Sequence, residues 1–146
     1  MNTSTLPTIV DAGLLVFLAG QVAFDDQGIV RGDTAAQTRL CLECMEHALR
    51  ETGLSSSQLV ECTIWLCHQA DVAAFDDTYA AYFGSRKPAC TILIGRLTVA
   101  GALVEIDAVA RRAAGGMDLE SLTHCPYMQA TARRSRDAEL EQRTTA

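Results

Sequence analysis

The sequence has few aromatic residues, fewer basic than acidic residues and no long apolar run, and each absence limits the class of protein. Its 12 Lys and Arg are outnumbered by 18 Asp and Glu, which gives a net charge of -6. Nonspecific binding of nucleic acid relies on a basic face that neutralises phosphates, so we expect no nucleic-acid partner. No apolar run approaches the roughly 20 residues that cross a bilayer, and Leu14–Ala19 is too short for a signal peptide. We therefore expect a cytoplasmic protein with no membrane partner.

The 146 residues are 49% hydrophobic and 21% charged, a composition that is ordinary for a globular domain. A chain of this size buries about two-thirds of the surface that it exposes when unfolded, so it can form a substantial core. We predict one domain over residues 1–112. Gly115-Gly116 interrupts the apolar pattern and Asp137–Ala146 is highly charged. Residues 113–146 are therefore predicted to be a C-terminal extension that is at most partly ordered.

Six cysteines are present, and four of them fall in segments of apolar periodicity, where cysteine acts as a small hydrophobic residue. We expect reduced thiols. Cys41 and Cys44 have the spacing of a redox or zinc-binding pair, but they lie in the middle of a predicted helix. A redox pair favours a helix N-terminus, and a structural zinc site has four ligands. Core packing is the favoured interpretation of the pair, and no metal site is predicted.

Helical periodicity is clearest from Thr34 to Thr52, with Asp33 as the predicted N-cap and Gly53 as the stop. Residues alternate in polarity from Val60 to Cys67, which predicts a strand. A second helix is predicted from Asp71 to about Phe83. With strands near the N-terminus, the order is strand, strand, helix, strand, helix, strand, strand. This order indicates an α+β domain with both helices on one face of a mixed sheet. The other face needs cover, and with 5% aromatic residues self-association is a reasonable way to supply it.

The last two strands, Cys90–Arg96 and Leu103–Ala110, are separated by a short connection and predict an antiparallel hairpin. If the hairpin folds about its middle, Cys90 pairs near Glu105. Directly opposed side chains in such a pair lie roughly 5 Å apart at Cβ. On this register a thiol and a carboxylate meet on one face of the sheet.

Several segments, taken together and in order over roughly residues 8 to 112, resemble the Rid family of reactive-intermediate deaminases, also called YjgF. They are Leu18-Ala19-Gly20-Gln21, Gly32–Thr38, Leu54–Glu61, Asp77–Phe83, Pro88-Ala89 and Val104–Ala110. The resemblance implies a single chorismate-mutase-like α+β domain, and we predict a mixed six-stranded sheet with two helices on one face. It also implies a homotrimeric barrel with pockets between subunits. Members of this family hydrolyse enamines and imines without a metal or organic cofactor, so we expect a small-molecule substrate and no cofactor.

The departures from the family pattern fall at the implied site. Where the deaminases carry Pro-Ala-Arg, with the arginine gripping a substrate carboxylate, this chain has Pro88-Ala89-Cys90. The family's N-terminal tyrosine falls near Leu6. Glu105 matches the acidic residue that orients or activates water. Three further departures are Ala19, Asp76 and Ile92, where the family carries serine, asparagine and cysteine. The predicted substrate-binding residues are these three with Gly20 and Tyr79, whose hydroxyl is also expected to find a partner in the core or an interface, and strand parity adds Arg96.

Two enzymatic hypotheses and one binding hypothesis follow. In the first, Glu105 is the general acid and base that hydrolyses an imine or enamine, and Cys90 only shapes the pocket. In the second, Cys90 is a nucleophile on a carbonyl or imidoyl carbon, activated by Arg96 or by His68 or His124 from a neighbouring subunit. A carboxylate beside the thiol raises its pKa, so a positive neighbour is needed. In the third, a trimer of this fold binds a small metabolite and does no chemistry.

Overall fold

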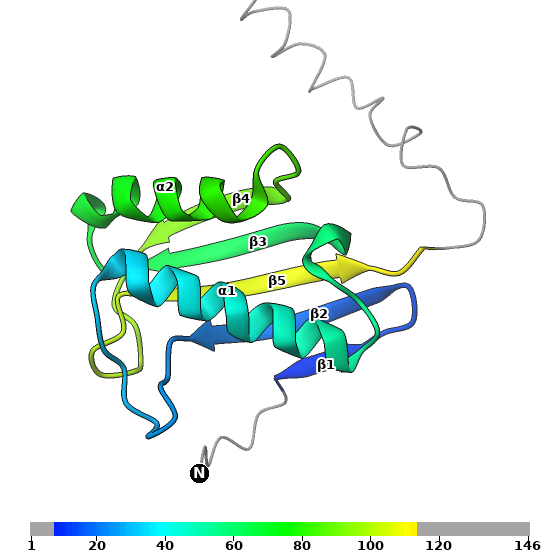
Figure 1. Cartoon of the computed structure of the whole chain (residues 1–146), viewed down its shortest axis with the longest axis horizontal. Coiled ribbons are helices and arrows are strands. Elements are labelled where there is room, and N and C mark those ends of the chain that lie inside the picture. The colour runs from blue at the N-terminus through cyan, green and yellow to red at the C-terminus, as the bar shows by residue number, and fades with distance from the viewer. Residues whose placement is uncertain (1–7, 114–146) are drawn as a thin grey trace, which may run out of the picture. The chain divides into compact units, whose positions relative to one another are not determined.

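The computed structural model describes residues 8–113 of the chain, so the positions near Leu6 and the predicted extension beyond residue 113 lie outside the described residues. Five strands and two helices follow one another along this part of the chain (Figure 1). They are β1 (Ile9–Asp11), β2 (Leu15–Val22), α1 (Thr34–Glu51), β3 (Leu59–Leu66), α2 (Val72–Phe83), β4 (Ala89–Ile94) and β5 (Val104–Arg111), with short 3-10 turns at Ser56–Gln58 and Gln69–Asp71.

Helix α1 confirms the prediction made from its capping residues and periodicity. The Asp33 carboxylate accepts a hydrogen bond of 2.8 Å from the backbone N–H of Ala36 at its start. Gly53 follows its end with φ of +74°, a conformation that favours glycine. Its buried face comprises Thr34, Gln37, Thr38, Cys41, Leu42, Met45 and Leu49. Cys41 is therefore a core residue, as its place in the helical pattern indicated, while Cys44 is half-buried.

The five strands form one mixed sheet in the order β1-β2-β5-β3-β4, in which β3 and β4 are parallel and the other pairs are antiparallel. The α+β prediction is confirmed. The described sheet has five strands and not the predicted six, and Val30 forms just an isolated bridge with Phe24.

The predicted hairpin between the last two strands is wrong. β3 lies between β4 and β5, so Cys90 pairs with Cys62 and Glu105 pairs with Trp65. The reason is the helix α2, which gives the crossover that a parallel pair requires and returns the chain to the outer side of β3. Strand periodicity shows which residues share a face, but it does not show which strand is the neighbour.

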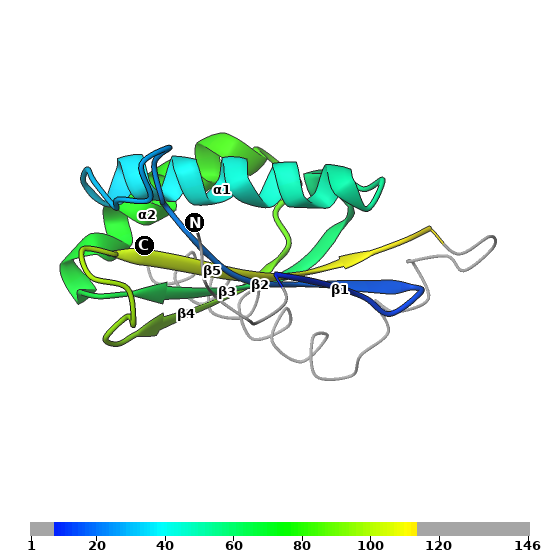
Figure 2. The ribbon, with the colours of Figure 1, turned by 90° about the horizontal axis from the view of Figure 1, so that it is seen from below.

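Both helices cover one face of the sheet, and the core lies between the helices and the sheet (Figure 2). Val16 and Leu18 of β2, Ile64 of β3 and Ile106 of β5 point into this core. The opposite face carries large apolar side chains that are 36% to 44% exposed, namely Leu15, Phe17, Trp65 and Leu93. This exposed apolar face is the surface that the sequence analysis expected to need cover. Neither helix within residues 8–113 is long and apolar enough to cross a membrane.

Candidate active site

Two carboxylates, two residues apart on β5, point to the face of the sheet that the helices leave open. Val104, Ile106 and Ala108 point into the core, so Glu105 and Asp107 point to the opposite face. Both acidic residues are half-buried. In the sheet register Glu105 lies between Val22 of β2 and Trp65 of β3. Glu105 and Asp107 are the two acidic residues of β5, and both lie on its open face.

A β-bulge in β2 lies directly beside these carboxylates. Leu18 pairs with Ala108 and Gln21 pairs with Ile106, so Ala19 and Gly20 both stand opposite Asp107. Two residues against one is the definition of a bulge, and bulges are over-represented next to active sites because they re-aim side chains. The Gln21 side-chain amide donates a 2.6 Å hydrogen bond to the carbonyl oxygen of Ala19, which holds the bulged segment.

Gly20 leaves the space that the Glu105 side chain occupies. A Cβ atom at position 20 would lie 2.7 Å from Cδ and 2.9 Å from Cγ of Glu105, and closer still to Oε1. Real Cβ atoms essentially never approach other atoms this closely, so the carboxylate lies over the bare backbone of Gly20. The structure thus brings together three residues that the sequence analysis selected: Ala19, Gly20 and Glu105.

The environment of the carboxylates favours their protonated forms. Burial raises the pKa of Glu105 above its ordinary value, and the negative charge of Asp107 raises it further. Burial also raises the pKa of Asp107, and the Trp65 indole N–H opposes this shift. A carboxyl group whose pKa moves toward neutral pH is suited to giving and taking protons. Sequence parity alone would have found Asp107 and Trp65, since both share the face of Glu105.

The coupling between the two carboxylates predicts a change in pH dependence. Asp107→Asn removes the charge that raises the pKa of Glu105, so that pKa falls. If Glu105 acts as a base, the acidic limb of the kcat/KM profile moves to lower pH in the variant. Activity measured between pH 4 and 8 checks this, with Asp26→Asn in an exposed loop as the control that leaves the limb in place. If the acidic limb of the kcat/KM profile is at the same pH in Asp107→Asn as in the wild type, a group other than Glu105 controls it.

A second group of predicted residues gathers around the other edge of the sheet. Cys90 and Ile92 lie on β4, and Asp76 and Tyr79 lie on α2. Partial burial raises the pKa of the Cys90 thiol, Tyr79 lowers it, and the charges of Asp76 and Glu61 raise it. The groups acting on Cys90 within the described chain are thus a phenol and two carboxylates. Nothing among them activates the thiol at neutral pH.

The predicted activators of Cys90 are placed elsewhere in the subunit. Arg96 is six residues from Cys90 in the sequence and lies beyond the end of β4 at Ile94. His68 follows β3, which runs parallel to β4 with Cys62 beside Cys90, so it lies at the same far end. Activation of Cys90 by Arg96, or by His68 or His124 of a neighbouring subunit, stays a prediction, and His124 lies outside the described residues.

Cys90 and Glu105 do not form a pair within one subunit. The strand β3 separates them, and Cys90 stands level with Cys62 while Glu105 stands level with Trp65, three residues further along. Their side chains also point to opposite faces, because residues in register share a face and Cys62 is buried under the helices. The register assumed from sequence is wrong in both position and parity.

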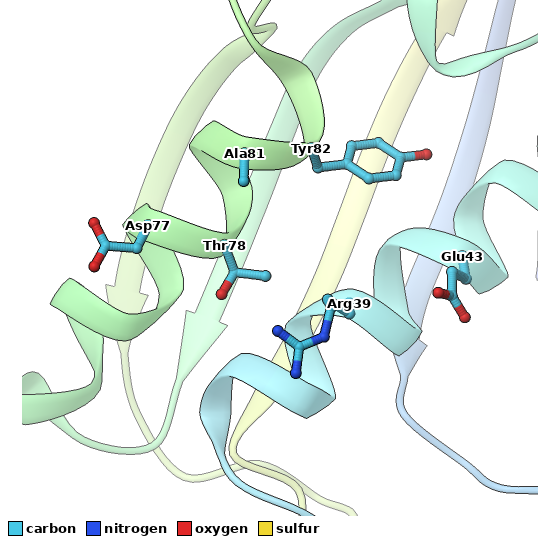
Figure 3. A pocket seen from close by; sticks show the side chains of 6 residues that line it. All are labelled: Arg39, Glu43, Asp77, Thr78, Ala81 and Tyr82. Atoms are coloured by element: carbon cyan, nitrogen blue, oxygen red, sulfur yellow. The ribbon is translucent and has the colours of Figure 1, made fainter.

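One cavity of the single subunit lies away from both groups. It has a volume of about 420 Å³ and opens between α1 and α2, where Arg39 of α1 and Thr78 and Tyr82 of α2 point into the space between the helices (Figure 3). Glu43, Asp77 and Ala81 complete its lining. None of the predicted site residues is among them.

The described residues form an α+β domain with two helices on one face of a mixed sheet, and the comparisons with known proteins identify its family. A family model described as endoribonuclease L-PSP matches residues 5–112. The chain belongs to this family, which confirms the resemblance. It is 38% identical to protein DfrA of Myxococcus xanthus over 69% of this chain and 79% of that protein.

Two further relatives connect the family to a fold and an activity. The 3-aminoacrylate deaminase RutC of Acinetobacter baylyi is 36% identical over 66% of this chain and 78% of its own length. The crystal structure of the YjgF gene product of E. coli has a TM-score of 0.71 and 28% identity, covering 76% of this chain and 91% of that chain. The family thus includes a deaminase of an enamine-type substrate.

Proposed function

We propose that this protein hydrolyses a C–N bond in a small imine or enamine, with Glu105 as general acid and base. The observation that carries the proposal is the placement of Glu105 over Gly20 at the bulge, with its pKa raised. The relative named 3-aminoacrylate deaminase acts on a compound of this chemical class.

The chemistry needs one group that moves protons twice. The Glu105 carboxylate takes a proton from water as the water oxygen bonds to the electrophilic carbon of the imine. That proton passes to the nitrogen, which gives the neutral carbinolamine. Glu105 then takes the proton of the carbinolamine hydroxyl and delivers it to the nitrogen, so that the C–N bond breaks, ammonia leaves and a carbonyl compound remains. An enamine first accepts a proton on carbon to give the iminium ion, which loses a proton from nitrogen to become the imine. A carboxyl group with a raised pKa serves each of these steps better than an ordinary one.

In this proposal the protein is a homotrimer and the substrate pocket lies between subunits. The exposed apolar face with Phe17 and Trp65 gives the subunits a reason to associate. Because Glu105 and Cys90 of one subunit are separated by β3, a pocket that contains both takes Glu105 from one subunit and Cys90 from the next. Asp76, Tyr79 and Ile92 accompany Cys90, while Ala19 and Gly20 accompany Glu105; Arg96 stays a substrate-binding prediction.

The surroundings of Cys90 favour a substrate without a carboxylate. The charged groups that act on the thiol, Asp76 and Glu61, are both acidic. A carboxylate placed there meets like charges and no guanidinium fork. In this proposal Cys90 lines the pocket and is not a nucleophile.

Imines that two oxidases generate in the assay mixture test the function and the substrate class together. An amine oxidase forms imines without a carboxylate, and an amino-acid oxidase forms 2-imino acids. Semicarbazide traps both, so the enzyme reduces semicarbazone formation in proportion to its rate. We expect at least tenfold higher kcat/KM for the carboxylate-free imines, since tenfold corresponds to about 1.4 kcal/mol. The reverse preference contradicts the substrate class, and no acceleration of either imine contradicts the deaminase.

The alternative function is a trimer that binds a small metabolite without chemistry. The raised pKa of Cys90 and the acidic groups beside it support this alternative, because they provide no second catalytic group. It predicts that a bound carbonyl or imine analogue keeps its affinity in Glu105→Gln. A ribonuclease function, named in the description of the family model, fits less well. Glu105 and Asp107 present negative charge on the same face of β5, which repels a phosphate backbone.

A further inference from the structure

Two cysteines stand directly opposite each other on neighbouring strands. Cys62 of β3 and Cys90 of β4 are partners in the parallel register. Neighbouring strands lie about 4.8 Å apart, and disulfides join residues whose Cα atoms are about 4.4 to 6.8 Å apart. Residues in register point to the same face, so both thiols lie on the helix side of the sheet. Cys62 is fully buried and Cys90 is exposed, which makes one thiol accessible from solution and the other its neighbour in the core.

A buried phenol completes this group. The Tyr79 side chain is 4% exposed, and its Oη atom has no hydrogen-bond partner within the described residues. It acts on the pKa of both thiols, so it lies within reach of Cys62 and Cys90. The ring packs between Phe75, with 5.2 Å between centroids, and Phe83, with 4.6 Å. A rigid, unpaired donor next to two thiols can bind a sulfur anion or the oxygen that leaves an oxidised sulfur.

We propose that Cys62 and Cys90 are a modification site, a thiol pair that hydrogen peroxide converts into an intramolecular disulfide. In the first step the Cys90 sulfur attacks one peroxide oxygen, an S–O bond forms, the O–O bond breaks and the other oxygen leaves as water. In the second step the Cys62 sulfur attacks the Cys90 sulfur, the S–S bond forms and the S–O bond breaks. The Tyr79 hydroxyl donates a hydrogen bond to that leaving oxygen, which departs as water. Two thiols lose two electrons in total and one peroxide becomes two waters.

This site does not depend on the proposed deaminase activity. It uses the helix side of β3 and β4, whereas Glu105 lies on the opposite face of β5. Cys90 is exposed in the single subunit, and hydrogen peroxide, with two heavy atoms, is small enough to reach it. The disulfide joins the outer strand β4 to β3 covalently.

The burial of the two thiols and the groups around them set the pH dependence of disulfide formation. The titratable groups that act on the pKa of one or both thiols are Asp76 and Tyr79 from α2 and Glu61, whose side chain precedes that of Cys62 on β3 and points to the opposite face. Burial is the largest cause of the raised pKa of both thiols, and it raises that of Cys62 to about 11. The thiolate is the reactive form, and its fraction grows tenfold per pH unit below the pKa. We therefore expect disulfide formation about tenfold faster at pH 7.5 than at pH 6.5.

Peptide mapping of the full chain tests the proposal. The reduced protein is treated with hydrogen peroxide, remaining thiols are alkylated with iodoacetamide in denaturant, and the products are digested with trypsin. Cys62 and Cys67 share the tryptic peptide 51–86, so the assay uses the Cys67→Ser background, while Cys90 falls in peptide 87–96. We expect a species that joins the two peptides, two hydrogens lighter than their sum, which a thiol reductant separates again.

Three variants make the outcome decisive. Cys62→Ser and Cys90→Ser each abolish the joined species, and Cys90→Ser changes an exposed residue, so its fold is retained. Tyr79→Phe slows formation several-fold, because the donor is lost. The proposal is overturned if Cys90 is converted to sulfinic acid while Cys62 is still alkylated, if Cys90 joins a different cysteine, or if the joined species forms equally fast at both pH values.

Discussion

Glu105→Gln is expected to lower kcat/KM for imine hydrolysis by about 10²- to 10⁴-fold, the range typical of a lost general acid or base. Glutamine keeps the size of the side chain and its place over Gly20, but it cannot exchange a proton with water or with the leaving nitrogen. The semicarbazide assay with carboxylate-free imines measures the loss. Because the proton transfer is missing in the transition state, we expect the change mainly in kcat.

The same variant is expected to keep its stability or gain some. The folded-state pKa of Glu105 is raised, so the folded protein binds a proton more tightly than the unfolded chain does. The charged carboxylate therefore costs stability once the pH rises above its ordinary pKa, and glutamine removes that cost. Thermal unfolding at pH 7 checks this. A lower Tm together with lost activity would indicate a structural role for Glu105 instead.

Glu51→Gln is the matched control, since it makes the same change at an exposed position on the last turn of α1. It should retain full activity. A Glu105→Gln protein within twofold of the wild type contradicts the assignment of Glu105 as acid and base. If neither protein accelerates hydrolysis but both bind a carbonyl analogue equally well, the binding function replaces the enzymatic one.

Gly20→Ala is expected to lower kcat/KM by about 10²-fold with a small loss of stability. The new Cβ occupies the space of Cγ and Cδ of Glu105, so the carboxylate moves away from its position. A misplacement of about 1 Å at a reacting group can cost 10² in rate. The φ of Gly20 is not in the left-handed region, so alanine tolerates the backbone and the fold is retained.

Gly95→Ala is the control for Gly20→Ala. A Cβ at position 95 would lie 3.8 Å from the Trp65 ring, which is ordinary van der Waals contact, and its φ is not positive either. Its rate should stay within a few-fold of the wild type. If Gly20→Ala is as active as Gly95→Ala, the site tolerates a displaced Glu105 carboxylate and the geometric argument is wrong.

A double-mutant cycle identifies how Gly20 acts. In our account Gly20 contributes by positioning Glu105, so the double variant should be as slow as Glu105→Gln alone. Rate losses that simply add would show that Gly20 contacts the substrate by itself.

Local patterns in the sequence determined the elements and their faces. Asp33 and Gly53 mark the ends of α1 because capping and a positive φ are decided by neighbouring residues. Alternation placed Glu105 opposite to the buried side of β5, because successive side chains of a strand point to opposite faces. For the same reason Asp107 and Trp65 were within reach of the sequence, although they were not selected.

The neighbours of each strand were decided by the tertiary structure. Alternation in β4 and β5 is the same whether they pair with each other or with β3, so no local pattern distinguishes the predicted hairpin from the observed order. The crossover through α2 places Cys90 beside Cys62 and leaves Glu105 beside Gly20 and Trp65. The chain thus carried the residues of both sites in its sequence, whereas the distances between them depended on which strand came to lie in the middle of the sheet.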